Sequence, residues 1–324
     1  MTEIDVFGMC NAIYDLQADV EYEMLEELGL VPGAVHLIDE HQHAALLTQI
    51  APRVVHEAAG GSGANTMVGV AALGGLASFT SKVGPDPHGE GYIASLAKAG
   101  VQPLLRTGSG RTGSCIVLVT PDGQRTMCTY VGEGRHYGPE DVPLPWIARS
   151  RTVYVTGYLW DTPCQKQAVK LAVEEACAHR VPVALSLADR FCIERNQAEF
   201  ANLLDTRVKI VFANEDEATL MCDAQDALAA ARSLGSEGRT AFVTLGANGA
   251  LVASKGVVEH VPTDAVTPRD TTGAGDAFAA GVLYGLSRGM APLTAAQIGC
   301  RLAAHVVSRI GPRPDPDVAR QIST

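Results

Sequence analysis

Apolar and polar positions follow two different periods along this 324-residue chain. From about residue 150 onward, short apolar runs typical of buried strands alternate with longer amphipathic segments typical of helices. Residues 152–159 and 182–188 are predicted strands, and the segment 164–179 between them has the spacing of a helix. Strands and helices that alternate in this way predict a parallel sheet with helices on both faces.

A different pattern occupies residues 114–132, where two β-like runs flank the tripeptide Pro121-Asp122-Gly123. Proline fixes φ and glycine accepts a positive φ, so this tripeptide predicts a turn and the whole segment predicts a hairpin. A hairpin beside a doubly wound sheet is suited to cover a cleft at the carboxyl ends of the strands.

The chain opens with a short predicted strand at residues 4–8, and a less regular acidic stretch follows to about residue 45. We therefore expect an α/β fold in which a core domain carries a small β lid. The expected core consists of residues 1–11, 46–109 and 136–324. The expected lid consists of residues 12–45 and 110–135.

Charge and cysteine usage narrow the class of protein. The net charge is −11 and no run of Lys or Arg stands out, which argues against a nucleic-acid partner. The eight cysteines are scattered without a CxxC pair, which argues against a zinc knuckle and suits a reducing cytoplasm. No basic leader or apolar stretch of ~18 residues is present, so we expect a cytoplasmic protein without a membrane partner.

The most specific string is Asp270-Thr-Thr-Gly-Ala-Gly-Asp-Ala-Phe278, at the start of a predicted helix. In it, Gly273, Ala274 and Gly275 precede Asp276. Free N–H groups and the helix dipole make such a helix start an anion site. Asp276 could take a proton from a hydroxyl while the amides stabilise a transferring phosphoryl group. The alternative is an ordinary helix N-terminus with a favourably placed acid.

Three weaker polar clusters accompany this string. The loop Gly60-Gly-Ser-Gly-Ala-Asn65 allows close approach of backbone to a ligand, and Asn65 can donate and accept hydrogen bonds. The segment Asn214-Glu-Asp-Glu217 follows a predicted strand and suits water-mediated magnesium binding, or simply begins a helix. Asn11 and Asp15 follow the first strand, where they could clamp vicinal hydroxyls or be ordinary loop residues.

The segment Gly108-Ser-Gly-Arg-Thr-Gly113 fits the GxGxxG pattern of dinucleotide-binding loops. That fingerprint requires a strand before it and a helix after it, whereas this segment precedes a hairpin strand. The sequence therefore disfavours a dehydrogenase, and the phosphate-binding string GxxxxGK[ST] is absent.

The strings DTTGAGDAF and GGSGAN together resemble the ribokinase/PfkB family of carbohydrate and nucleoside kinases, over nearly the whole chain and in the family's order. The resemblance implies a Rossmann-like (ribokinase-like) core with a β-sheet lid, and transfer of the ATP γ-phosphoryl group to a hydroxymethyl group. It implies Asp276 as general base and Gly273, Ala274 and Gly275 as its anion hole. The residues implied to bind ATP and its Mg²⁺ are Asn214, Glu217 (also the metal residue), Thr244, Gly246 and Gly249.

Within this family, FGMCNAIYD at residues 7–15 is similar to adenosine kinases, which makes bacterial adenosine kinase-like members the most similar group. The resemblance places Tyr158 and Phe191 beside the base and Arg125 near the phosphates. Leu187 to Arg190 differ from the Ser-Ala-Pro run of animal adenosine kinases. The full set of residues implied to bind the acceptor is Asn11, Asp15, Gly60, Gly61, Asn65, Tyr158, Phe191 and Arg125.

The sequence thus favours adenosine as the acceptor. A sugar such as ribose or fructose is the alternative acceptor, and a non-catalytic nucleotide-sensing protein is the alternative from another class. Some relatives use K⁺ beside the anion hole, where Asp270 could help to hold it. The sequence leaves K⁺ and the choice between monomer and homodimer open.

Overall fold

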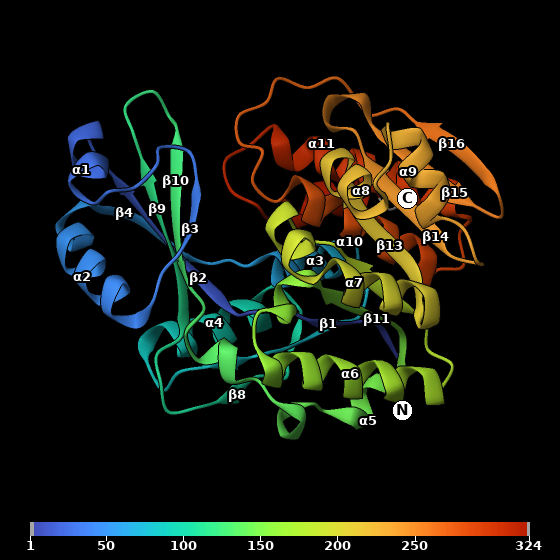
Figure 1. The fold of residues 1–324 in the computed structure, drawn as a ribbon, viewed down its shortest axis with the longest axis horizontal. Coiled ribbons are helices and arrows are strands. Elements are labelled where there is room, and N and C mark those ends of the chain that lie inside the picture. Colours follow the sequence, from blue (N-terminus) through green and yellow to red (C-terminus); the bar gives the residue numbers. More distant parts are fainter. Residues whose placement is uncertain (1–2, 323–324) are drawn as a thin grey trace.

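The computed structural model describes residues 3–322 and contains a nine-stranded, a five-stranded and a two-stranded sheet (Figure 1). In the nine-stranded sheet the order is β16-β15-β14-β13-β12-β11-β1-β5-β7. In this spatial order, all neighbouring strands from β14 across to β7 pair in parallel. Strands β15 and β16 add an antiparallel edge beside β14. Its strands are β1 (Ile4–Met9), β5 (Ala77–Thr80), β7 (Gln102–Pro103), β11 (Ser150–Thr156), β12 (Val183–Ser186), β13 (Val208–Asn214), β14 (Thr240–Thr244), β15 (Ala250–Ser254) and β16 (Val257–Val261).

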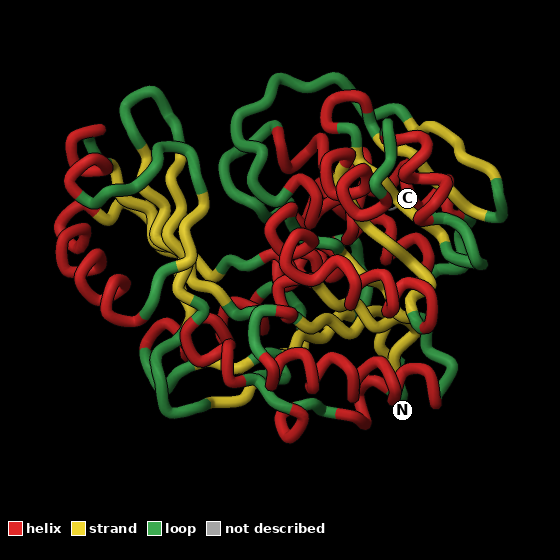
Figure 2. Tube along the Cα trace, viewed as in Figure 1, coloured by secondary structure: helices red, strands yellow, loops and turns green. Residues whose placement is uncertain are grey.

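Helices cover both faces of this sheet, because its strands bury side chains on both sides (Figure 2). In β1, Val6 belongs to one apolar cluster, and Phe7 and Met9 belong to the other. One face carries α3 (Ser62–Ala72), α4 (Pro87–Lys98), α10 (Ala274–Ser287), α11 (Pro292–Val307) and α12 (Pro316–Ile322). The other face carries α5 (Leu144–Ile147), α6 (Pro163–Ala178), α7 (Arg190–Thr206), α8 (Glu215–Cys222) and α9 (Ala227–Leu234).

The five-stranded sheet has the order β3-β10-β9-β2-β4. Strands β9 and β10 form the predicted antiparallel hairpin. Two helices, α1 (Tyr22–Glu27) and α2 (Glu40–Ile50), lie on the side of this sheet that faces away from the larger sheet (Figure 1). We call this sheet with its two helices the lid. Its strands are β2 (Ile13–Asp19), β3 (Val35–Leu37), β4 (Val54–Ala59), β9 (Gly113–Val119) and β10 (Arg125–Tyr130).

The first lid segment extends beyond the expected limit at residue 45. Strand β4 pairs antiparallel with β2, from Tyr14 opposite Ala59 to Ala18 opposite Val54. Leu46 and Ile50 of α2 are buried against the lid sheet. The lid therefore includes residues up to Ala59, because pairing between β2 and β4 is a tertiary contact with no local sequence signal. The first two and last two residues of the expected core lie outside the described part of the chain.

The loop with the GxGxxG pattern wraps around a carboxylate of the chain itself. The N–H of Gly110 donates to Glu133 Oε2 at 2.7 Å. A Cβ atom on Gly108 would lie 1.9 Å from Glu133 Oε1, so a larger residue there would require Glu133 to move. The two-stranded sheet, β6 (Lys82–Val83) with β8 (Arg106–Thr107), leads into this loop. Over residues 3–322, no helix has the length and apolar character needed to span a membrane.

Candidate active site

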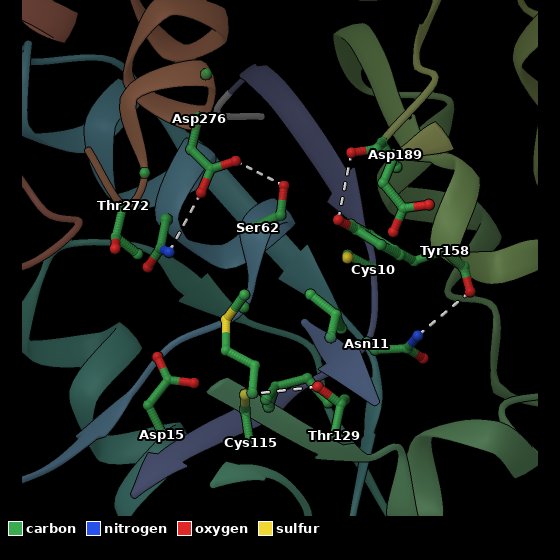
Figure 3. Close-up of a pocket in the computed structure, with 18 of the residues that line it drawn as sticks. Cys10, Asn11, Asp15, Ser62, Cys115, Thr129, Tyr158, Asp189, Thr272 and Asp276 are labelled. Carbon is green, nitrogen blue, oxygen red and sulfur yellow. Dashed lines mark hydrogen bonds between the residues drawn. The ribbon is translucent and has the colours of Figure 1, made fainter. Parts of the chain in front are cut away.

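A cleft of about 620 Å³ lies between the lid and the carboxyl ends of the central strands (Figure 3). Asn11, Tyr158 and Ala188 line it directly after β1, β11 and β12, and α10 contributes its first turn. This is the position where open α/β sheets bind their ligands. The volume falls within the ~300–1,000 Å³ usual for small-molecule sites.

Asp276 projects into this cleft from the first turn of α10, where two side chains hold its carboxylate (Figure 3). Ser62 Oγ donates to Oδ1 at 2.6 Å, and Asn65 Nδ2 donates to Oδ2 at 3.3 Å. Burial raises the pKa of Asp276 to about 6, and the two hydrogen bonds oppose this rise. The carboxylate is therefore mostly ionised at pH 7. Its pKa lies close to the operating pH, which is where a general base is most effective.

The backbone before Asp276 presents free amides. Gly273 caps α10 with a φ of 78°, and a Cβ there would meet Pro312 at 2.5 Å. Gly273 and Gly275 N–H make no hydrogen bond to residues 3–322, and Gly275 faces open space. Ala274 N–H instead donates to the Thr271 carbonyl at 3.2 Å. Of the three amides expected in the anion hole, the structure thus leaves those of Gly273 and Gly275 available.

Asp15 lines the same cleft from β2 of the lid, and its carboxylate accepts no hydrogen bond from the described residues (Figure 3). Burial raises its pKa to about 7, Arg313 and Arg125 lower it, and Asp276 raises it further. The carboxylate packs on Gly60, where a Cβ would lie 1.9 Å from Oδ2. Neighbouring Gly61 has a φ of 83° and caps α3.

Asn11, Tyr158 and Phe191, three more of the residues expected to bind the acceptor, line the cleft from the core. The amide of Asn11 donates to the Tyr158 carbonyl at 3.3 Å and accepts from Gln165 Nε2 at 2.7 Å. Tyr158 donates its hydroxyl to the Ala188 carbonyl at 3.3 Å. Phe191, on the first turn of α7, is 54 % exposed at the rim. The structure brings Asn11, Tyr158 and Phe191 to one cleft with Asp15 and Asp276.

A second cavity of about 110 Å³ adjoins Asp276 and contains three of the five residues expected to bind the nucleotide, Asn214, Glu217 and Thr244. Asn214 and Glu217 form a reciprocal cap on α8, with Asn214 Nδ2 donating to Glu217 Oε1 at 2.7 Å. Burial raises the pKa of Glu217 to about 7. Gly246 and Gly249 line neither cavity. Gly249 packs against the Val261 carbonyl in the turn between β14 and β15.

Arg125 begins β10 of the lid and reaches across the cleft to the core. Its guanidinium donates to both oxygens of Asp270, at 2.8 and 3.1 Å, and to Thr272 Oγ1. The backbone N–H groups of Thr272 and Gly311 complete the set, each at 3.0 Å from Asp270. The four hydrogen bonds fill the carboxylate's usual acceptor positions. In this lid position the Asp270 carboxylate does not fit a K⁺ ion.

Several residues in the cleft or beside it carry no separate prediction from the sequence. Ser62 stood inside the glycine-rich string at a helix start, which was a usable signal. Arg313, on the connector between α11 and α12, gave none, because it lies 248 positions from its partner Asn65. The sequence also did not reveal the apolar lid residues of the cleft, Val35, Leu37, Val117 and Met127, or its charged rim residues, Asp161, Asp189 and Arg195.

Comparison with known proteins shows the family of this chain. A family model described as pfkB family carbohydrate kinase matches residues 37–318. The chain belongs to this family. The finding confirms the expected family, and with it the expected class of enzyme, a phosphotransferase with an alcohol group as acceptor.

Individual relatives within the family carry different names. The chain is 27% identical over 237 residues to guanosine-inosine kinase of Escherichia coli K12, covering 69% of this chain and 54% of that kinase. An adenosine kinase structure from Sinorhizobium meliloti has a TM-score of 0.90 and 37% identity, covering 99% of both chains. A probable sugar kinase from Rhizobium etli has a TM-score of 0.91 and 34% identity, also covering 99% of both chains. These structures confirm the ribokinase-like fold.

Proposed function

We propose that this pfkB family member is an ATP-dependent nucleoside kinase, with adenosine as the favoured acceptor and AMP and ADP as products. One observation carries the proposal: the ionisable Asp276, the free amides of α10 and the unpartnered Asp15 all face one cleft beneath an apolar lid. A base, an anion site and a hydroxyl-binding carboxylate are the parts that phosphoryl transfer to a ribose requires.

The chemistry follows from this arrangement. The Asp276 carboxylate accepts the proton of the acceptor's hydroxymethyl group as its oxygen attacks the γ-phosphorus of ATP. The bond between the γ-phosphorus and the bridging oxygen breaks, and ADP leaves. The amides of Gly273 and Gly275, with the dipole of α10, stabilise the negative charge on the transferring group. Ser62 and Asn65 keep the carboxylate in place through their hydrogen bonds.

Asp15 and the glycine-rich loop suit the ribose of the acceptor. The Asp15 carboxylate is half-buried in the cleft and has no partner among residues 3–322, so two hydroxyl donors of a ribose would supply it with hydrogen bonds. Asn65 and the backbone of Gly60 and Gly61 lie beside it. Asn11 is already held by Gln165 and Tyr158, which leaves one N–H and one lone pair for a ligand.

Apolar surface in the cleft favours a base on that ribose. Leu37 and Val35 of the lid are 57 % and 45 % exposed and line the cleft, as do Met127 and Phe191. A purine would cover these side chains, and an aromatic neighbour such as Phe191 contributes ~0.5–1.5 kcal/mol beyond area burial. The Sinorhizobium meliloti relative is named an adenosine kinase, which supports the same choice.

We propose that ATP and its Mg²⁺ bind at Asn214, Glu217 and Thr244. Each Glu217 oxygen accepts one hydrogen bond from Asn214 and keeps a free lone pair. Mg²⁺ retains several waters in proteins, so a single carboxylate that binds through water suits it. Among the described residues, no group of three or more His, Cys, Asp or Glu side chains is placed to hold a metal ion directly. Mg²⁺ would neutralise the phosphate charge.

A free sugar is the second candidate acceptor. The Rhizobium etli relative, named a probable sugar kinase, covers as much of this chain as the adenosine kinase does. Asp15, Asn65 and Asp276 would serve a sugar hydroxyl as well as a nucleoside. The apolar lid residues separate the two acceptors, because a sugar leaves them exposed to water.

A panel of acceptors tests the proposal directly. ADP release from ATP and Mg²⁺ would be measured with adenosine, guanosine, inosine, ribose and fructose, and kcat/KM compared. We expect the highest value with adenosine. A higher value with ribose or fructose would replace the nucleoside assignment with the sugar one, and no turnover with any acceptor would remove the kinase assignment.

Asp276→Asn tests the role of the base. We expect kcat to fall by ~10²–10⁴-fold, the usual contribution of general-base catalysis. Binding of ATP, measured by calorimetry, should persist because the amides of α10 remain. Asp264→Asn, at an exposed acid outside the cleft, is the matched control. Turnover of Asp276→Asn within tenfold of wild type would show that another group takes the proton.

A further inference from the structure

The connector between α11 and α12, residues 308–315, contacts the active site at three successive positions. Gly311 N–H donates to Asp270 Oδ2 at 3.0 Å. Pro312 packs on Gly273, which caps α10. Arg313 Nε donates to Asn65 Oδ1 at 3.2 Å. Two of these contacts are with groups of the proposed mechanism, Gly273 and Asn65, although the connector contributes no residue to either cavity.

The contact with Asn65 determines which way its side-chain amide faces. A guanidinium group donates hydrogen bonds and cannot accept them. Arg313 therefore requires the oxygen of the Asn65 amide to face it, which turns the nitrogen toward Asp276 Oδ2. A flipped amide would place its oxygen against the Asp276 carboxylate, where two acceptors repel each other. The orientation of Asn65 thus depends on its neighbour.

Arg313 is also a half-buried cation with an incomplete set of partners. Nη1 donates to Ser95 Oγ at 2.9 Å, whereas Nη2 is shielded from solvent and has no partner among residues 3–322. An unpaired buried N–H on a charged group is costly, and a position that served packing alone would favour an apolar side chain. Its charge acts on Asp15, whose pKa it lowers against the effect of burial.

The other charged and titratable groups around Asp15 do not replace this charge. Arg125 also lowers the pKa of Asp15, but it lies on the lid and is paired with Asp270. Asp276 raises the pKa of Asp15. Tyr92 and Cys115 also interact with the Asp15 charge, and burial raises the pKa of each. Arg313 is therefore the cation from the core that opposes the effect of burial on the pKa of Asp15.

We propose that Arg313 is a positioning residue of this active site, which orients the Asn65 amide toward Asp276. The inference rests on the proposed kinase function. The charge of the same side chain has a second effect, which kinetics can separate from the first. The orientation of Asn65 acts on the base and should appear in kcat, whereas the charge beside Asp15 acts on acceptor binding and should appear in KM.

The first experiment compares Arg313→Met, Arg313→Lys and wild type with the best acceptor of the panel. Arg313→Met should lose ~10–100-fold in kcat, the range of a hydrogen bond in a charged network, and should raise KM at pH 7. Arg313→Lys keeps the charge but lacks the guanidinium fork, so KM should return toward wild type while kcat stays reduced. Ser95→Ala removes the outer hydrogen bond of the same guanidinium and should stay within about threefold of wild type.

A double-mutant cycle tests whether Arg313 acts through Asn65. Asn65→Ala should lower kcat, and adding Arg313→Met should lower it less than about twofold further, because the shared step is already lost. Losses in kcat that multiply, or an Arg313→Met kcat within twofold of wild type, would overturn the positioning role. Should Arg313→Met fail to fold, Arg313→Gln takes its place: its uncharged amide can accept as well as donate, so an unchanged kcat there contradicts the amide argument.

A titration that needs no turnover tests the charge. The carboxyl carbon of Asp15, assigned by comparison with Asp15→Asn, should titrate by NMR near pH 7 in wild type. The midpoint should be higher in Arg313→Met and close to wild type in Arg313→Lys. An unchanged midpoint in Arg313→Met would refute the electrostatic part. A wild-type protein that phosphorylates no acceptor would remove the proposed function, and this titration would still decide on Arg313.

Discussion

The ion pair between Arg125 and Asp270 joins the lid to the core, and we expect Arg125→Ala to open the lid. Asp270 is 5 % exposed and Arg125 is 32 % exposed. Both terminal nitrogens of the guanidinium group, Nη1 and Nη2, reach the carboxylate, which is the geometry of a strong charge-assisted pair. Truncation leaves Asp270 with the N–H donors of Thr272 and Gly311, so the carboxylate does not become unpaired.

These contacts set the size of the effect. Hydrogen bonds to charged groups contribute ~1.5–3 kcal/mol, and exposed ion pairs contribute ~0–1 kcal/mol because water screens them. With the arginine one-third exposed and two donors retained on Asp270, we expect Arg125 to stabilise the closed lid by ~1 kcal/mol, which is a ~5-fold change in the ratio of closed to open protein.

Hydrogen exchange measures this ratio in the free protein. Amides in β10 and in residues 268–275 should exchange ~5-fold faster in Arg125→Ala, and added salt should narrow the difference because it screens the wild-type pair. Arg53→Ala is the matched control, since Arg53 donates to the Gln49 carbonyl within the lid. Unchanged exchange in Arg125→Ala, or an equal increase in Arg53→Ala, would refute the proposal that this pair holds the lid.

Two further predictions concern the acceptor. Because burial raises the Asp15 pKa to about 7, the folded protein binds a proton more tightly there than the unfolded chain, so this group lowers stability as pH rises from 4 to 7. Asp15→Asn should therefore raise the melting temperature at pH 8 and not at pH 4, while weakening acceptor binding; equal shifts at both pH values would contradict this. Phe191→Ala should lower kcat/KM for adenosine ~2–10-fold and leave that for ribose unchanged, and equal losses for both acceptors would argue against a base beside Phe191.

Local pattern sufficed for the class of fold and for the position of the reaction centre. The alternation of apolar runs with amphipathic segments predicted the parallel sheet, and Pro121-Asp122-Gly123 predicted the hairpin between β9 and β10. Both signals are local, because strand and helix periods and turn chemistry depend on residues that are close in sequence. The string around Asp276 likewise predicted a helix start, because its glycines and acid act within one turn.

The tertiary structure decided what those segments contact. It placed β4 beside β2 in the lid, and it turned Gly108 and Gly110 around Glu133 instead of a nucleotide phosphate. Such contacts follow from the packing of a whole domain, and no local period or turn encodes them.

The same holds for the partners of the catalytic carboxylate. Ser62 reaches Asp276 across 214 positions, and Arg313 reaches Asn65 across 248. The sequence by itself determined which acid stands at a helix start with free amides. Only the fold determined which donors hold that acid and which cation lies beside Asp15, because these distances are set by how the connector, α3 and α10 pack together.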